Sequence, residues 1–153
     1  MKTIVVFSDS HFSKIDDKLI KIIDEADYVF FLGDGLNSLD KVLFHKNFIG
    51  VKGNCDSINY SDEEVVEIEK VRILLTHGHK YHVKRNLDEL ILRTEELKCN
   101  AVFYGHTHIP KIDITNSITC ICPGSTSYPR FGNPSYAYVI IHEGKIVSKI
   151  VNL

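Results

Sequence analysis

The sequence predicts an α/β protein in which two β-sheets pack face to face as a sandwich flanked by helices. In the N-terminal third, short apolar runs alternate with helix-like segments, which is typical of parallel strands joined by crossovers. The C-terminal third contains mostly strand-like runs, and His142–Lys145 has the composition of a hairpin turn. The 153 residues show no internal repeat and no linker, so we expect a single domain over residues 1–153.

The N-terminal elements follow from local pattern. Lys2–Phe7 is rich in β-branched residues and predicts a buried strand. Leu19, Ile22 and Ile23 recur at helical spacing, which predicts an amphipathic helix over Lys14–Ala26. We expect a second strand, a short helix and a third strand to follow, at Tyr28–Leu32, Leu36–Phe44 and Asn47–Val51.

The remaining elements include one helix and several strands. Leu87, Leu90, Ile91 and Leu97 share helical spacing and predict a helix over roughly Val83–Lys98. Prolines and glycines indicate a structured loop across residues 123–134. The predicted strands are Glu64–Glu69, Val71–Thr76, Ala101–Tyr104, Lys111–Ile114, Ser117–Cys122, Tyr136–His142 and Lys145–Val151.

Composition excludes several classes of protein. Eighteen basic and twenty acidic residues give a net charge of −2, which argues against a large nucleic-acid surface. The N-terminal apolar run is too short for a signal peptide, and no apolar stretch approaches the roughly 20 residues that span a bilayer. We therefore expect a cytoplasmic protein that does not enter the membrane. Because its four cysteines form no CxxC pair, we expect free thiols rather than disulfides.

Five loops carry side chains that can bind metals, and each follows a predicted strand. In open α/β sheets, the carboxyl ends of the strands form the edge at which ligands bind. Imidazole combined with carboxylate or amide oxygen suits divalent first-row metals. Two such ions sharing a carboxylate could clamp a phosphoryl group during in-line displacement. The loops are Asp9-Ser10-His11, Gly33-Asp34-Gly35, Gly53-Asn54-Cys55-Asp56, His77-Gly78-His79 and Gly105-His106-Thr107-His108.

The ordered motifs DxH, GD, GN, H and GHxH resemble those of the calcineurin-like metallophosphoesterase superfamily. The GNCD, HGH and PGS variants are similar to its small, single-domain phosphodiesterase branch. The resemblance runs from Asp9 to the Pro123-Gly124-Ser125 loop. It implies a two-sheet sandwich and a hydrolase that cleaves phosphodiesters with a hydroxide bridging two metal ions.

The resemblance also implies roles for individual residues. Asp34 would bridge the two ions, which we expect to be Mn²⁺, with Ni²⁺, Fe²⁺ or Zn²⁺ as alternatives. The first ion would have Asp9, His11, Asp34 and His108 as ligands, and the second Asp34, Asn54, His77 and His106. Asp34, Asn54 and His79 are the expected catalytic residues. The expected substrate contacts are Ser10, Asn54, Cys55, His79 and Ser125.

Cys55 departs from the family pattern. Many relatives have a histidine after the metal-binding asparagine, and that histidine is thought to protonate the leaving group. A thiol with an ordinary pKa near 8.5 is a poor acid at neutral pH. We considered a nucleophile, a metal ligand, a disulfide partner and a residue that shapes the pocket, and we favour the last. Substrates with good leaving groups, such as aryl phosphodiesters, should therefore react best.

Two other functions remain open. A scaffold on the same fold is one, since a retromer subunit resembles this branch, but the complete ligand set favours an enzyme. A phosphomonoesterase or nucleotide-specific hydrolase is the other. Few residues are available for a cap, so we expect an open site that accepts varied small phosphodiesters. The resemblance also suggests a homodimer.

Overall fold

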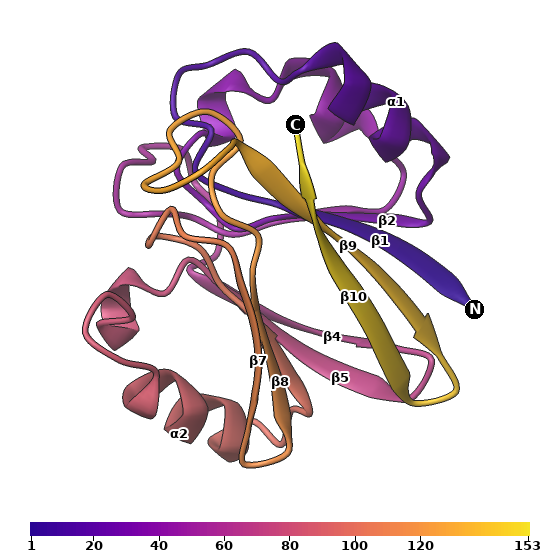
Figure 1. Cartoon of the computed structure of the whole chain (residues 1–153), viewed down its shortest axis with the longest axis vertical. Coiled ribbons are helices and arrows are strands. Elements are labelled where there is room, and N and C mark those ends of the chain that lie inside the picture. Colours follow the sequence, from indigo (N-terminus) through magenta and orange to yellow (C-terminus); the bar gives the residue numbers. More distant parts are fainter.

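A computed structural model describes all 153 residues of the chain, from Met1 to Leu153. Two five-stranded sheets pack face to face, with helices on both outer sides (Figure 1). The helix α1 (Asp17–Glu25) covers one sheet and α2 (Asp88–Glu96) covers the other. This arrangement confirms the predicted α/β sandwich. No helix combines the length and apolar character needed to cross a membrane.

The first sheet has the strand order β10-β9-β1-β2-β3. The first three strands of the chain run parallel to one another, as the alternation of strands and helices predicted. β9 pairs antiparallel with β1, and β10 with β9. The bounds are β1 (Lys2–Phe7), β2 (Tyr28–Phe31), β3 (Phe48–Gly50), β9 (Ser135–His142) and β10 (Lys145–Asn152).

The second sheet has the order β4-β5-β6-β8-β7. Its central strands β5, β6 and β8 are parallel, and an antiparallel strand closes each edge. The loops that follow β1, β2, β3, β5 and β6 all lie at one edge of the sandwich. The bounds are β4 (Glu63–Ile68), β5 (Val71–Thr76), β6 (Ala101–Phe103), β7 (Lys111–Thr115) and β8 (Ile118–Cys122).

The hydrophobic core has three layers. Ile4 and Val6 point between the two sheets, whereas Val5 and Phe7 point toward α1. A third cluster lies between the second sheet and α2. Strands buried on both faces have no polar alternation, which explains the continuous apolar runs in the sequence. All four cysteines are free, as expected.

The predicted helices were too long. The Asp16 carboxylate caps α1 by accepting a hydrogen bond from the Lys18 N–H at 2.7 Å, so this helix begins at Asp17 rather than Lys14. α2 begins at Asp88, after a short 3₁₀ turn, η3 (His79–Tyr81), and further turns, and the Asn86 Oδ1 accepts a hydrogen bond from the Asp88 N–H at 3.0 Å. His82 ends that turn in a left-handed conformation, with a φ of 54°.

The predicted helix over Leu36–Phe44 is also wrong in type. The segment forms two 3₁₀ helices, η1 (Leu36–Ser38) and η2 (Asp40–Phe44). Asp40 has a φ of 43°, which interrupts right-handed helical geometry between them.

Candidate metal centre

The seven predicted ligands come from five loops at one edge of the sandwich. Asp9 and His11 follow β1, Asp34 follows β2 and Asn54 follows β3 in the first sheet. The second sheet contributes His77 after β5, with His106 and His108 after β6. The structure therefore brings together residues that are up to 99 positions apart, counted from Asp9 to His108.

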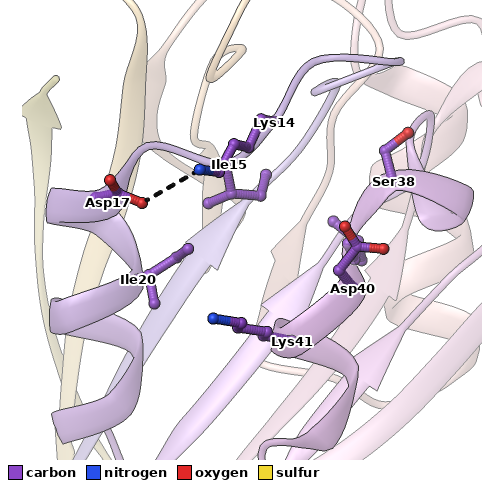
Figure 2. Close-up of a pocket in the computed structure, with 8 residues that line it drawn as sticks. Lys14, Ile15, Asp17, Ile20, Ser38, Asp40 and Lys41 are labelled. Atoms are coloured by element: carbon purple, nitrogen blue, oxygen red, sulfur yellow. Dashed lines mark ion pairs between the residues drawn. The ribbon is translucent and has the colours of Figure 1, made fainter.

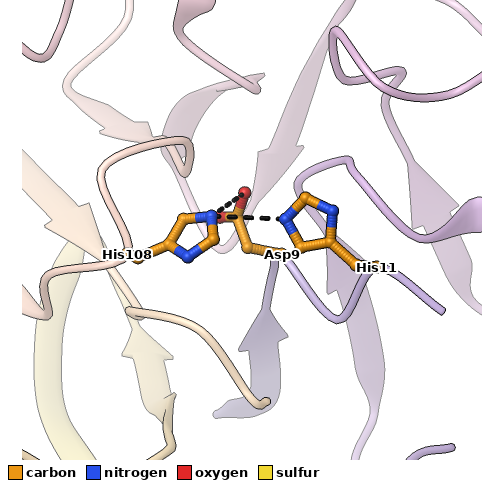
Figure 3. Close-up of side chains that lie close together, drawn as sticks. All are labelled: Asp9, His11 and His108. Atoms are coloured by element: carbon orange, nitrogen blue, oxygen red, sulfur yellow. Dashed lines mark hydrogen bonds and ion pairs between the residues drawn. The ribbon is translucent and has the colours of Figure 1, made fainter. Parts of the chain in front are cut away.

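Asp9, His11 and His108 form a first group of potential ligands (Figure 3). The His108 Nε2 lies 3.3 Å from the Asp9 Oδ1 and 3.4 Å from the His11 Nε2. The His108 Nδ1 is 2.7 Å from the Tyr128 carbonyl, which orients the ring so that Nε2 faces the other two side chains. A hydrogen bond from the outer ring nitrogen is the usual support of a metal-binding histidine.

Asp34, His77 and His106 form a second group. The His77 Nε2 lies 3.2 Å from the Asp34 Oδ2, 3.2 Å from the His106 Nδ1 and 3.1 Å from the Asn54 Oδ1. Its Nδ1 is 2.6 Å from the Leu32 carbonyl, so His77 is oriented in the same manner as His108. This ring is fully buried.

The two groups are joined through Asp34 and His11. These residues also form a third cluster with Cys55, in which the potential ligand atoms lie within 4.8 Å of one another. Asp34 thus belongs to two of the three clusters. Its Oδ1 accepts a hydrogen bond from the Cys55 N–H at 2.8 Å, and its Oδ2 faces His77.

The donor set fits divalent cations. The Asp9 Oδ1 is buried and has no hydrogen-bond donor, although its Oδ2 accepts bonds from the Ser8 hydroxyl and the His106 N–H. A buried carboxylate oxygen without a donor is costly unless a cation satisfies it. Imidazole nitrogens held 3.2–3.4 Å apart, together with these carboxylates, form a typical first-row metal environment.

The electrostatics of the cluster shift its histidines in opposite directions. Burial lowers the pKa of His106 to about 4, and the neighbouring His77 and Lys84 add to this effect. The adjacent Asp9 carboxylate raises the pKa of His108, although burial opposes it. The pKa of His77 is also raised, because contacts with Asp34 and Asp9 outweigh its burial. His106 is therefore a neutral imidazole at neutral pH, the form that can bind a metal.

Five of the ligands have left-handed backbone conformations, which are unusual for residues other than glycine. Such conformations typically cost about 1–3 kcal/mol each and are concentrated at functional sites. Gly33 shows why the surrounding loops are glycine-rich: a Cβ there would lie 2.6 Å from the Gly53 nitrogen. The φ values are 56° for Asp9, 50° for His11, 60° for Asp34, 72° for His106 and 59° for His108.

Asp56 holds two of these loops together, a role that the sequence analysis missed. Its Oδ2 accepts hydrogen bonds from the N–H groups of Asp34 and Gly53, at 2.8 and 2.9 Å. Its Oδ1 accepts from Gly35 and Leu36, at 2.8 and 3.1 Å. An aspartate three residues after a strand-end glycine was the available signal, but the partner loop is about twenty residues away in the sequence.

Two predicted substrate contacts, Ser10 and Ser125, have buried hydroxyls. The Ser10 Oγ lies beneath Gly35, where a Cβ would approach it to 2.3 Å. The Ser125 Oγ donates to the Asp9 carbonyl at 2.7 Å and accepts from the Tyr128 N–H at 2.7 Å. Ser125 thus holds the Pro123–Pro134 loop against the first ligand loop, and contact of either serine with substrate stays a prediction.

His79 and Cys55 lie beside the cluster. The His79 ring centroid is 5.4 Å from that of His77 and 6.1 Å from that of His106. Its Nδ1 is buried without a hydrogen-bond partner. Cys55 is exposed, and burial of its sulfur and the nearby Asp34 carboxylate raise the pKa of its thiol. A raised pKa is the opposite of what a cysteine nucleophile requires.

A separate cavity of about 120 Å³ lies between α1 and the 3₁₀ helices (Figure 2). Lysine and aspartate side chains line it, and Lys14 pairs with Asp17 at 3.8 Å. None of the predicted ligands borders this cavity. The candidate centre at the strand ends is therefore distinct from it.

The sequence is similar to known phosphoesterases. The model of the calcineurin-like phosphoesterase superfamily domain matches residues 1–144. The probable metallophosphoesterase YsnB of Bacillus subtilis is 32% identical over 133 residues, which cover 83% of this chain and 76% of YsnB. The phosphodiesterase YfcE of Escherichia coli is 36% identical over 97 residues, covering 57% of this chain and 48% of YfcE.

Solved structures show the same fold. A conserved uncharacterized protein of Streptococcus pneumoniae, described as a predicted phosphoesterase, superposes with a TM-score of 0.84 and 30% identity, covering 99% of this chain and 89% of that one. Vacuolar Protein Sorting 29 from Cryptosporidium parvum has a TM-score of 0.86, covering 99% and 91%, but only 20% identity. The motifs, the fold and the superfamily match agree, and the chain belongs to the calcineurin-like phosphoesterase superfamily.

Proposed function

We propose that this protein is a dinuclear metal-dependent phosphodiesterase. The observation that carries the proposal is the convergence of seven ligand-competent side chains in which Asp34 belongs to two clusters at once. A carboxylate in that position suits a ligand shared by two cations. The name of the relative YfcE supports phosphodiesters as the substrate class.

The proposed ligands divide as the motifs suggest. Asp9, His11, Asp34 and His108 would hold one ion, and Asp34, Asn54, His77 and His106 the other. When bound, two divalent ions supply Lewis-acid chemistry for phosphoryl transfer. The carboxylate and amide oxygens suit Mn²⁺, our expected working metal, whereas the affinity order favours later metals, so Ni²⁺, Fe²⁺ and Zn²⁺ are the alternatives.

The chain's own residues position the phosphoryl group. Two buried carboxylates, Asp9 and Asp34, neutralise the cationic charge. The Asn54 amide borders the second cluster without adding charge, 3.1 Å from His77. His79 is the nearest histidine outside the ligand set, so we assign it a hydrogen bond to the phosphoryl oxygens or to the leaving group.

A binding scaffold is the second candidate, favoured by the likeness in fold to Vacuolar Protein Sorting 29. Hydrolysis of bis(p-nitrophenyl) phosphate separates the two functions. We expect metal-depleted protein to regain turnover when Mn²⁺ is added, together with about two ions per chain by metal analysis. Absence of turnover with Mn²⁺, Ni²⁺, Fe²⁺ and Zn²⁺ would exclude the enzyme and favour the scaffold. A comparison with p-nitrophenyl phosphate would distinguish a diesterase from a monoesterase.

A further inference from the structure

A groove leaves the candidate metal centre on the side of His106 and His108. It has a volume of about 280 Å³, and Lys84 and Arg130 are its two permanently charged lining residues. Thr107 and Tyr128 complete its wall with the two histidines. No carboxylate borders this groove, so its charge is positive.

Lys84 and Arg130 lie on segments that also position the proposed metal ligands. The Arg130 N–H donates to the His108 carbonyl at 3.1 Å. Tyr128, which lies on the same loop as Arg130, contacts the His108 Nδ1 through its carbonyl oxygen. Lys84 follows Val83, which is 5% exposed and packs against Gly78, next to His77. Lys84 lies between β5 and α2, and Arg130 lies in the loop that joins β8 to β9, so two separate segments anchored to the centre border the groove.

Neither cation is neutralised within the protein. No carboxylate oxygen lies within 4.0 Å of Lys84 or Arg130, although other surface lysines and arginines form such pairs, including Lys80 with Asp62 at 2.6 Å. The groove continues into a wider hollow of about 580 Å³ that shares Lys84, Thr107 and Arg130. Arg85, Lys111, Asp88 and Asp113 also line that hollow, but Lys111 already pairs with Asp113 at 3.7 Å.

We propose that Lys84 and Arg130 form an anion subsite for a second phosphate group on the substrate. The inference rests on the proposed function, because the reacting phosphodiester would occupy the metal centre next to His106 and His108. One of its ester groups would then extend along the groove. The favoured substrates are phosphodiesters in which that group carries a further phosphate, as in a nucleotide phosphorylated at its far end.

The chemistry of the two side chains suits this role. A guanidinium group binds phosphate through two parallel N–H donors, and an ammonium group adds a mobile point charge. The groove is open and polar, so a charged group can enter with little loss of hydration. An uncharged ester group would gain nothing from Lys84 or Arg130, and the subsite would therefore discriminate between substrates by charge.

A matched pair of substrates tests the subsite by activity. Thymidine 5′-(p-nitrophenyl phosphate) and the same compound with a 3′-phosphate have identical reacting centres. We expect the Mn²⁺-loaded protein to prefer the phosphorylated compound by about tenfold in kcat/KM, mostly through KM. The variant Lys84→Ala/Arg130→Ala should lose that preference. Lys145→Ala/Lys149→Ala on β10 removes equal charge outside the groove and should retain it.

Binding to metal-depleted protein tests the subsite without turnover. Thymidine 3′,5′-bisphosphate is titrated and followed by ¹H–¹⁵N NMR, with the 5′-monophosphate as reference. We expect the bisphosphate to bind about tenfold more tightly than the monophosphate and to shift the amide signals of Lys84 and Arg130. In the double variant, the two compounds should bind with equal affinity.

The two experiments separate the possible failures. Turnover with an unchanged substrate preference in Lys84→Ala/Arg130→Ala would overturn the subsite and leave the phosphodiesterase intact. Absence of turnover in the unaltered protein would overturn the phosphodiesterase, and the NMR titration would then decide the subsite alone. The anion subsite would be overturned if the unaltered protein and the double variant bound the bisphosphate with equal affinity.

Discussion

The two edges of the sandwich use left-handed residues for different purposes. At the hairpin edge, Glu69–Lys70, Asn116–Ser117 and Glu143–Gly144 each form a two-residue turn with positive φ at both positions. Such turns match the twist of the strands they join, and their side chains are largely exposed. At the opposite edge, left-handed residues direct side chains such as Asp9 and Asp34 into one buried cluster.

The two edges tolerate unfavourable positive φ angles for different reasons. At the hairpin edge, the turn itself requires the conformation. At the ligand edge, hydrogen bonds from neighbouring loops impose it, with Asp56 accepting four backbone N–H groups. Substitutions at the ligand edge should therefore change both activity and stability, whereas substitutions at the hairpin edge should change stability alone.

Asp34→Asn should have the largest effect. We expect turnover of bis(p-nitrophenyl) phosphate to fall by at least ~10²-fold, because the anionic ligand shared by two clusters is lost. Metal analysis should show fewer than two bound ions. Asp40→Asn is the control, since Asp40 is exposed, also has positive φ and belongs to no ligand cluster. Full activity in Asp34→Asn would contradict the shared-ligand assignment.

Asp56→Ala should destabilise the ligand edge. Four backbone donors lose a charged acceptor, and we expect the free energy of unfolding to decrease by about 3 kcal/mol. Urea denaturation of metal-depleted protein measures this without interference from ligand binding. Asp56→Asn keeps one acceptor oxygen and should lose less. A decrease below about 1 kcal/mol would show that the loops are held by other contacts.

Cys55→His should change the leaving-group preference. A histidine next to Asn54 can protonate a poor leaving group near neutral pH, so we expect the rate with alkyl phosphodiesters to rise about tenfold relative to aryl ones. The ratio of kcat/KM for the two substrate types is the measurement. If His79 already supplies the proton, His79→Ala rather than Cys55→His should change this ratio. Loss of turnover in Cys55→Ser with both metals bound would give the thiol an active role.

Glycine substitutions of one left-handed residue at each edge should differ in their effect on metal content. Lys70→Gly relieves a φ of 68° in an exposed turn and should stabilise the protein by about 0.5–1 kcal/mol without changing metal content. His11→Gly relieves a φ of 50° but removes a proposed ligand, so metal content should fall. Thermal denaturation and metal analysis of both variants test the comparison. Unchanged metal content in His11→Gly would remove His11 from the ligand set.

Glu63→Gln should have a modest effect on stability, and one that depends on pH. Burial acts to raise the pKa of Glu63, but hydrogen bonds from Arg93 and Tyr81 outweigh it and hold this pKa below its ordinary value. A lowered pKa stabilises the fold above the unfolded-state pKa of about 4.3, and this contribution is lost as pH falls through the folded-state pKa. We expect Glu63→Gln to cost about 1 kcal/mol at pH 7 and less at an acidic pH below the folded-state pKa. Denaturation at both pH values measures the difference.

Local pattern was sufficient for most of the strands. Lys2–Phe7 and Val71–Thr76 have the predicted bounds, because strands buried on both faces are continuous apolar runs. Helix starts were less predictable. The side chains of Asp16 and Asn86 accept hydrogen bonds from N–H groups at the starts of α1 and α2, and such contacts leave little trace in hydrophobic spacing.

The candidate site could be predicted as a set of residues but not as a geometry. Metal-competent side chains at strand ends were visible from Asp9 to His108. The burial of Ser10 and Ser125 was not, since it depends on Gly35 and on the loop after β8 lying over the first ligand loop. Asp56 was missed for the same reason, because its partners are on another strand's loop.

The strands, the order of the motifs and the expected chemistry of the centre could be predicted from the sequence, because these depend on residue identity and local spacing. Which side chains face one another follows instead from the packing of the two sheets. It joined two ligand groups through Asp34, placed Asp56 behind the loops and aligned Lys84 with Arg130 across a groove. The reason is physical: contacts between loops of different strands depend on how the two sheets pack, and no local pattern encodes that packing.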